Sequence, residues 1–127
     1  MKASGAKTSK YRNKKTTVNG ITFDSAKEAA RYKELMLMQR AGHIRKLRLQ
    51  PRFTLEEAYK DAETGDTIRA LQYIADFSYE EPVGGSQPLS PDYWRLVVED
   101  VKGKKTKEYE LKKKLMLNRN GIRILET

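Results

Sequence analysis

The chain has 127 residues and a formal net charge of +9, from 26 Lys or Arg against 17 Asp or Glu, which predicts one domain with an anionic partner such as nucleic acid. The absence of cysteine and the single histidine, His43, exclude disulfides, thiolate zinc sites and histidine-rich metal sites, so any chemistry falls to carboxylates and lysines. No apolar stretch is long enough for a transmembrane helix or a secretory signal, and we expect a cytoplasmic protein without membrane association.

Residues 1–15 form a basic segment with six Lys or Arg, no acid and almost no apolar side chain. Such a segment contributes little to a core, and we expect it to be flexible. It is either a solubilising terminus or a part of the protein that wraps nucleic acid. In the second case the residues that contact phosphates are Lys10, Arg12, Lys14 and Lys15.

Ordered structure is predicted to begin at residue 16. Two β-prone runs flank Asn19-Gly20, a residue pair favoured in tight turns, which predicts a hairpin over 16–23. A helix over 25–41 follows, because Ser25 is a good N-cap, Glu28 stands three residues later as in a capping box, and Gly42 ends the helical pattern.

The middle of the chain predicts strands. Alternating apolar residues indicate a strand over 44–59, in which Pro51 suggests an edge or a bulge. Turn formers fill 61–66, and the β-prone run 67–79 predicts a second strand that returns antiparallel to the first.

After a loop at 84–91, the apolar run 92–103 predicts a third strand that lies inside the sheet. Thr106 can cap a second helix through Asn118, and a short last strand follows at 122–125. The sequence therefore predicts a hairpin, a helix, three strands, a helix and a strand, in one α/β domain over 16–127.

Charged residues end the third strand, in the sequence VVEDVKG at 97–103. Asp100 and Lys102 share one face of this strand, while Glu99 points to the other face. Burying an ionised group is costly, so such charges pair with one another, bind a metal or reach a cleft. Asp100 and Lys102 are therefore candidate functional residues, or members of a structural network of ion pairs.

Asp76 is a lone acid in the apolar run YIADFSY. If the second and third strands are neighbours, Asp76 and Asp100 converge, and a hard cation such as Mg²⁺ is the usual neutraliser of two close carboxylates. Glu28 is the third candidate ligand, although its position three residues after Ser25 is equally that of a helix cap. Lys102 would hold the attacking water or stabilise charge on a phosphate.

The ordered set of Glu28 on a helix, Asp76 on a strand, and Asp100 with Lys102 on the next strand resembles the PD-(D/E)XK nuclease superfamily. The segments GITFDSAKEAARY, LQPRF, YIADFSY and VVEDVKG are also similar to a family of small phage and prophage nuclease-like proteins. The resemblance covers residues from about 20 to the end. It implies a restriction-endonuclease-like core, in which a mixed sheet made of a β-meander and one further strand is flanked by two helices.

The resemblance also implies an activity. Glu28, Asp76 and Asp100 would bind Mg²⁺, or Mn²⁺ in its place, and these three with Lys102 would form the catalytic set of a DNA endonuclease. Ala75 stands where the superfamily commonly has proline. The second helix often lies near the substrate in this superfamily, and its candidate phosphate contacts here are Lys104, Lys105, Lys112 and Lys113.

We therefore expect a phage-encoded enzyme of DNA recombination or processing, acting in the cytoplasm of a bacterial host on junctions or branched DNA. The alternative is a non-catalytic DNA-binding module of a phage replication or packaging complex. RNA binding is less favoured, since no aromatic platform for stacking unpaired bases is evident. Cutting both strands of a symmetric substrate usually requires two active sites, which would call for a homodimer.

Overall fold

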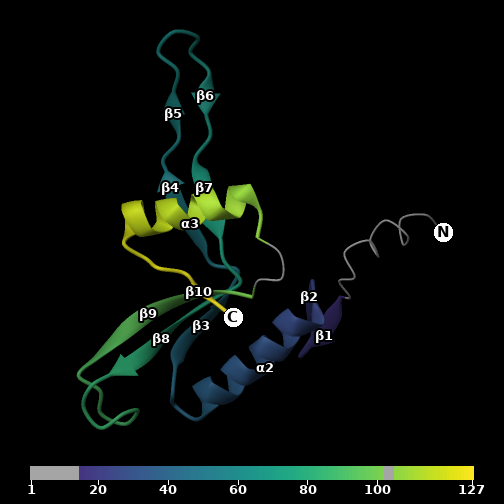
Figure 1. The fold of residues 1–127 in the computed structure, drawn as a ribbon, viewed down its shortest axis with the longest axis vertical. Helices are drawn as coiled ribbons and strands as arrows, with labels where there is room; N and C mark the ends of the chain where they lie inside the picture. The colour runs from purple at the N-terminus through teal and green to yellow at the C-terminus, as the bar shows by residue number, and fades with distance from the viewer. Residues whose placement is uncertain (1–14, 102–104) are drawn as a thin grey trace, which may run out of the picture.

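The structure is a computed structural model that describes residues 15–101 and 105–127. The described residues form a mixed α/β fold with two helices and a four-stranded mixed sheet (Figure 1). In chain order the elements are β1 (Thr16–Val18), β2 (Ile21–Phe23), α2 (Ala26–Arg40), β3 (Arg45–Leu49), β4 (Arg52–Glu56), β5 (Tyr59–Lys60), β6 (Thr67–Ile68), β7 (Leu71–Ile74), β8 (Phe77–Val83), β9 (Tyr93–Asp100), α3 (Lys107–Asn120) and β10 (Leu125–Glu126).

The central sheet has the strand order β10-β9-β8-β3. Strands β3, β8 and β9 are antiparallel neighbours, whereas β10 runs parallel to β9 with Leu125 opposite Glu99. A parallel neighbour needs a crossover connection, and α3 provides it. The predicted mixed sheet with two helices is confirmed, whereas the last strand, predicted over 122–125, spans Leu125–Glu126.

The N-terminal hairpin and α2 cover one face of the sheet. Asn19 and Gly20 both have positive φ, at 52° and 80°, as the turn between β1 and β2 requires. Ser25 caps α2, and its side chain accepts a hydrogen bond from the backbone N–H of Glu28 at 3.1 Å. The core on this face includes Phe23, Tyr32, Leu35, Phe77 and Tyr79.

Helix α3 packs on a second core with β4, β7 and β9, built from Leu55, Tyr73, Val98, Tyr109 and Met116. Thr106 caps the helix by accepting a hydrogen bond from the backbone N–H of Tyr109 at 3.0 Å, as predicted. Gly121 ends it in the left-handed region with φ of 67°. No helix in the described part of the chain is long and apolar enough to span a membrane.

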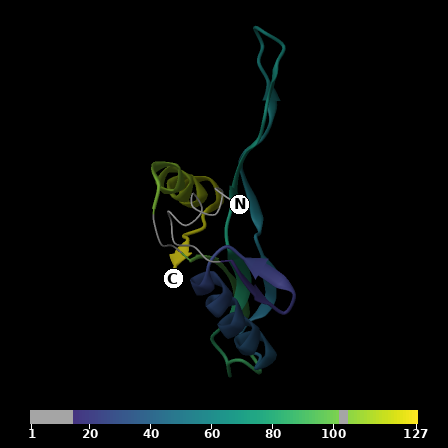
Figure 2. The same ribbon diagram turned by 90° about the vertical axis from the view of Figure 1, so that its right-hand side faces the viewer.

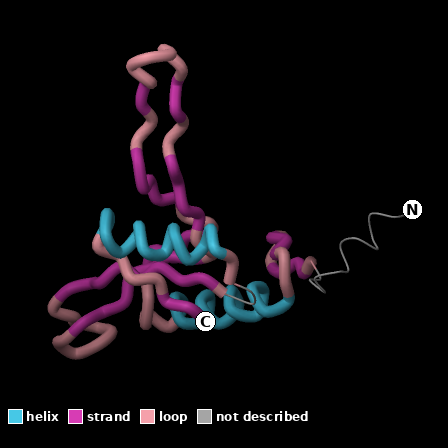
Figure 3. Tube along the Cα trace, turned by 45° about the horizontal axis from the view of Figure 1, so that its top comes forward, coloured by secondary structure: helices cyan, strands magenta, loops and turns pink. Residues whose placement is uncertain are grey.

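The prediction of single strands over 44–59 and 67–79 is wrong, since both are interrupted. Gln50 has φ of 50°, and Pro51, which has no N–H to donate, separates β3 from β4. Strand β4 then pairs with β7 and β5 with β6, outside the central sheet. Residues 52–74 thereby form a hairpin arm, whose base packs against α3 and whose outer part, with β5 and β6, extends beyond both helices (Figures 2 and 3). Its tip is the predicted turn, where the Asp61 side chain accepts a hydrogen bond from the backbone N–H of Glu63 at 2.8 Å.

Candidate active site

Asp76 and Asp100 lie together where the hairpin arm joins the central sheet. The backbone N–H of Asp76 donates to Oδ1 of Asp100 and to the carbonyl oxygen of Glu99, both at 3.1 Å. The backbone N–H of Val101 donates to Oδ2 of Asp76 at 2.7 Å. Asp100 is only 1% exposed, whereas Asp76 is half-buried. The structure thus brings together two of the residues selected from the sequence.

The interruption of the strands explains how Asp76 reaches this position. Asp76 stands between β7 and β8, and it lies next to Gln50 and Pro51, which stand between β3 and β4. The backbone N–H of Gln50 donates to the carbonyl oxygen of Asp76 at 2.9 Å, and that of Ala75 donates to the carbonyl oxygen of Pro51 at 3.1 Å. The backbone on both sides of Asp76 is therefore fixed by contacts from another segment.

Glu28 lies in the first turn of α2 and is half-buried. Within residues 15–101 and 105–127, no three Asp, Glu or His side chains are close enough to hold one metal ion. The structure therefore does not assemble Glu28, Asp76 and Asp100 into one cluster. The backbone N–H of Glu28 donates to the side chain of Ser25, the N-cap of α2. Lys102 and Lys104 lie outside the described residues, as do Lys10, Arg12 and Lys14.

Glu99 points to the opposite face from Asp100, as strand alternation predicts. It is fully buried, and it accepts hydrogen bonds from Nε and Nη2 of Arg31 at 2.8 and 2.7 Å, and from the hydroxyl of Tyr79. Burial acts to raise the pKa of Glu99, but the hydrogen bonds from Arg31 and Tyr79 outweigh it and hold the pKa below its ordinary value. This network joins α2 to the strand that carries Asp100.

A second network surrounds Glu126 of β10. Its carboxylate accepts hydrogen bonds from the hydroxyl of Tyr109 at 2.6 Å and from Lys113 at 3.0 Å, and it forms an ion pair with Lys105 at 2.9 Å. Together the Tyr109 hydroxyl, Lys105 and Lys113 lower the pKa of Glu126 to about 2. These contacts tie α3 to the last strand.

Replacing Glu126 by glutamine is expected to lower stability at neutral pH and to matter less in acid. A carboxyl with a lowered pKa stabilises the fold above its unfolded value, and this contribution is lost as the pH falls through the folded value. The difference between wild type and Glu126→Gln should therefore shrink between pH values of about 4.5 and about 2. Urea unfolding across this range measures it, and a difference independent of pH would contradict the assignment.

Four of the lysines predicted to bind DNA lie among the described residues, and each has an acid beside it. Lys105 and Lys113 are paired with Glu126, and Lys112 is paired with Glu108 at 3.0 Å. Lys15 lies 3.9 Å from Asp24. An acid on the same surface offsets each of these charges, so these four described residues present a weaker cationic surface than the sequence indicated.

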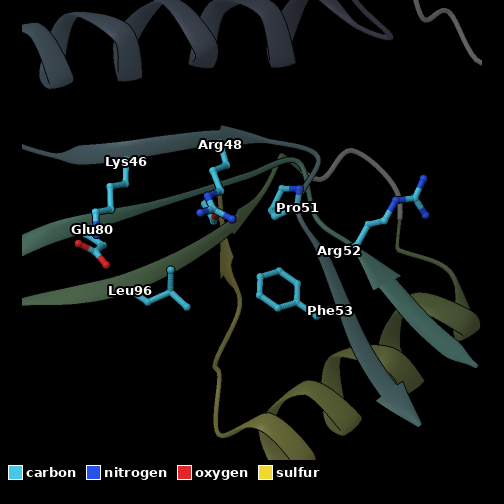
Figure 4. Close-up of a pocket in the computed structure, with 8 residues that line it drawn as sticks. Lys46, Arg48, Pro51, Arg52, Phe53, Glu80 and Leu96 are labelled. Atoms are coloured by element: carbon cyan, nitrogen blue, oxygen red, sulfur yellow. The ribbon is translucent and has the colours of Figure 1, made fainter. Parts of the chain in front are cut away.

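Sequence reasoning missed a basic surface on the sheet face opposite α2. We call it the cationic groove; it encloses about 290 Å³ and is defined by Lys46, Arg48, Pro51, Arg52, Phe53 and Leu96 (Figure 4). The alternation of basic and apolar residues over 45–53 was the available signal, since it places basic side chains on one face of a strand. Trp94 is half-buried, with the guanidinium of Arg45 over its ring at 4.2 Å.

The described residues thus form a small mixed α/β protein in which the backbone N–H of Asp76 contacts the buried carboxylate of Asp100, with a basic groove that includes the neighbouring Pro51. Residues 8–123 match the family described as "Protein of unknown function (DUF1064)", and the chain belongs to this family. No curated protein and no solved structure matches the chain. The family description assigns no activity.

Proposed function

We propose that this chain is a metal-dependent DNA endonuclease with a restriction-endonuclease-like fold. The observation that carries the proposal is the pairing of Asp76 with Asp100 at the ends of neighbouring strands. The order of elements supports it: α2, the meander β3-β8-β9, α3 and the parallel strand β10 follow the order of the PD-(D/E)XK core. On this view the hairpin arm is an insertion between the first two strands of the meander.

The chemistry of the two carboxylates fits a hard divalent cation. The backbone of Asp76 contacts the carboxylate of Asp100, which is almost fully buried, so a cation bound by both carboxylates would offset the cost of their charge. Mg²⁺ is commonly held by one or two carboxylates together with waters and substrate phosphates, so Asp76 and Asp100 suffice as protein ligands. We keep Glu28 as a candidate third ligand.

The backbone holds this pair in position. The N–H of Val101 orients the Asp76 carboxylate, and the N–H of Asp76 orients that of Asp100, so neither carboxylate depends on a flexible side chain for its direction. A divalent cation bound there would neutralise charge on a phosphodiester and lower the pKa of a bound water. We assign to Lys102 the stabilisation of the negative charge that develops on the phosphate.

The second candidate is a DNA-binding module without cleavage activity. One observation favours it: the described residues contain no group of three potential metal ligands. Both candidates share the phage context that the resemblance implies, in replication, packaging or recombination, and both would act in the bacterial cytoplasm. A homodimer remains part of the endonuclease proposal, because one chain supplies one pair of carboxylates.

The deciding experiment is cleavage of labelled duplex, flapped and four-way-junction DNA with Mg²⁺ or Mn²⁺. Wild type is compared with Asp76→Ala and Lys102→Ala, and with Asp66→Asn at the tip of the hairpin arm as a control for loss of an acid elsewhere. The proposal predicts metal-dependent cutting by wild type and the control only. DNA binding without metal-dependent cutting of any substrate would favour the binding module.

A further inference from the structure

The cationic groove combines unpaired positive charge with an apolar floor. Lys46, Arg48 and Arg52 are exposed, and none of them forms an ion pair with another residue in the part of the chain that the structure describes. Phe53 and Leu96 are the apolar members, and Leu96 is 48% exposed. Arg48 points toward the space between Leu96 and Phe53, while Arg52 lies beside Pro51 with its side chain directed away from the other labelled residues (Figure 4).

The one acid that lines the groove does not cancel this charge. Glu80 accepts a hydrogen bond at 2.7 Å from Nε of Arg45, which is not one of the cations that define the groove. The hydrogen bond from Arg45, with further effects of Lys46 and Arg48, lowers the pKa of Glu80. Since Glu80 and Arg45 offset each other, the net charge of the groove is that of Lys46, Arg48 and Arg52, and an anion would be attracted to it.

The backbone of β3 is shaped to present these side chains. Lys46 and Gln50, on either side of Arg48, have positive φ of 57° and 50°, a conformation that disfavours residues other than glycine. The pairing of β3 with β8 shifts register between Arg45 and Arg48, which marks a β-bulge. Bulges re-aim side chains at the edges of sheets, and β3 is an edge strand. Strain of this kind is typical of functional positions.

The groove leads to the carboxylate pair. Its member Pro51 accepts the hydrogen bond from Ala75, the residue before Asp76. Arg48 lies opposite Ser78 on β8, two residues after Asp76. A chain that lies along the groove with its phosphates on the cations would therefore run toward Asp76.

We propose that the cationic groove binds a single-stranded segment of DNA, with phosphates on Lys46, Arg48 and Arg52 and a base against Phe53 and Leu96. Cations that follow a backbone, combined with an aromatic ring, are the features by which proteins hold single strands without reading sequence. The inference deepens the proposed function, on which it rests, by naming the substrate class: branched or flapped DNA with an unpaired strand next to the cleavage site.

The test separates binding from cutting. Fluorescence anisotropy in EDTA measures the affinity for a labelled single strand and for the same strand annealed to its complement. Arg48→Ala should weaken single-strand binding several-fold and reduce the slope of log affinity against log salt by about 0.7, the value for one phosphate contact. Phe53→Leu keeps an apolar side chain at this position and should weaken single-strand binding by at least about fivefold.

Arg40→Ala, which removes an exposed arginine at the end of α2, is the matched control and should bind as wild type does. Unchanged single-strand affinity in both Arg48→Ala and Phe53→Leu would overturn the groove assignment even if the protein cuts DNA. Loss of single-strand affinity in these variants, in a protein that never cuts, would uphold the groove and overturn the endonuclease.

Discussion

Asp100→Asn is expected to abolish both metal-dependent cutting of DNA and the stabilisation of the folded protein by Mg²⁺ or Mn²⁺. The substitution keeps the shape of the side chain and an oxygen that can accept the hydrogen bond from Asp76 N–H. It removes a negative charge from the pair, so a cation loses half of its protein carboxylates. The loss in activity should exceed the about 100-fold that removal of an outer-shell group costs at metal sites.

The measurement is a pair of thermal unfolding curves, in EDTA and in saturating metal, alongside the cleavage assay. A ligand that binds only the folded state stabilises it by about 2.7 kcal/mol when present at about 100 times its dissociation constant. Wild type and the Asp66→Asn control should both gain this stability, whereas Asp100→Asn and Asp76→Asn should gain much less. Equal metal stabilisation of all four proteins would show that the cation binds elsewhere.

Arg31→Ala is expected to destabilise the fold by about 3–5 kcal/mol, because it leaves Glu99 buried without its cationic partner. The exposed pair of Arg95 with Glu81 is the matched control. These side chains are 59% and 35% exposed, so Arg95→Ala should destabilise the fold much less than Arg31→Ala does. Chemical denaturation at neutral pH compares the two variants with wild type.

The dependence on pH gives a second check of the same network. The pKa of Glu99 is held low in the wild-type fold, so its contribution is present above the unfolded value and is lost as the pH falls. In Arg31→Ala the buried Glu99 carboxyl can take up a proton as the pH falls, which removes the cost of burying its charge without a partner. This also reduces the stability difference between wild type and Arg31→Ala in acid. The difference between the two proteins should therefore be largest at neutral pH and should narrow in acid; a constant difference would contradict an ionised Glu99.

Features encoded by adjacent residues were predicted well. Asn19-Gly20 indicated the first hairpin, Ser25 and Thr106 indicated where the helices begin, and each acts through atoms within three residues of itself. Strand alternation likewise placed Glu99 and Asp100 on opposite faces. The convergence of Asp76 with Asp100 followed once the two strands were taken as neighbours, because register then fixes which residues meet.

Features set by distant parts of the chain were not predictable in this way. A proline at position 51 can stand at an edge, in a bulge or between strands, and only the pairing of β4 with β7 decides among these. Lys105 and Lys113 appeared available for DNA because their partner, Glu126, lies in the last strand. The cationic groove was missed because it is formed by several strands, whose approach depends on the whole sheet.

The length of the hairpin arm is independent of the geometry at Asp76 and Asp100. Both strands of the arm return to the body at one place, where Ala75 is bonded to Pro51. Inserting the same even number of residues into β5 and into β6 would leave every other side chain on its original face. Such insertions would move the tip outward without altering the register at this junction. Variants of this chain with a longer or a shorter arm are therefore expected to keep Asp76 and Asp100 in the same geometry.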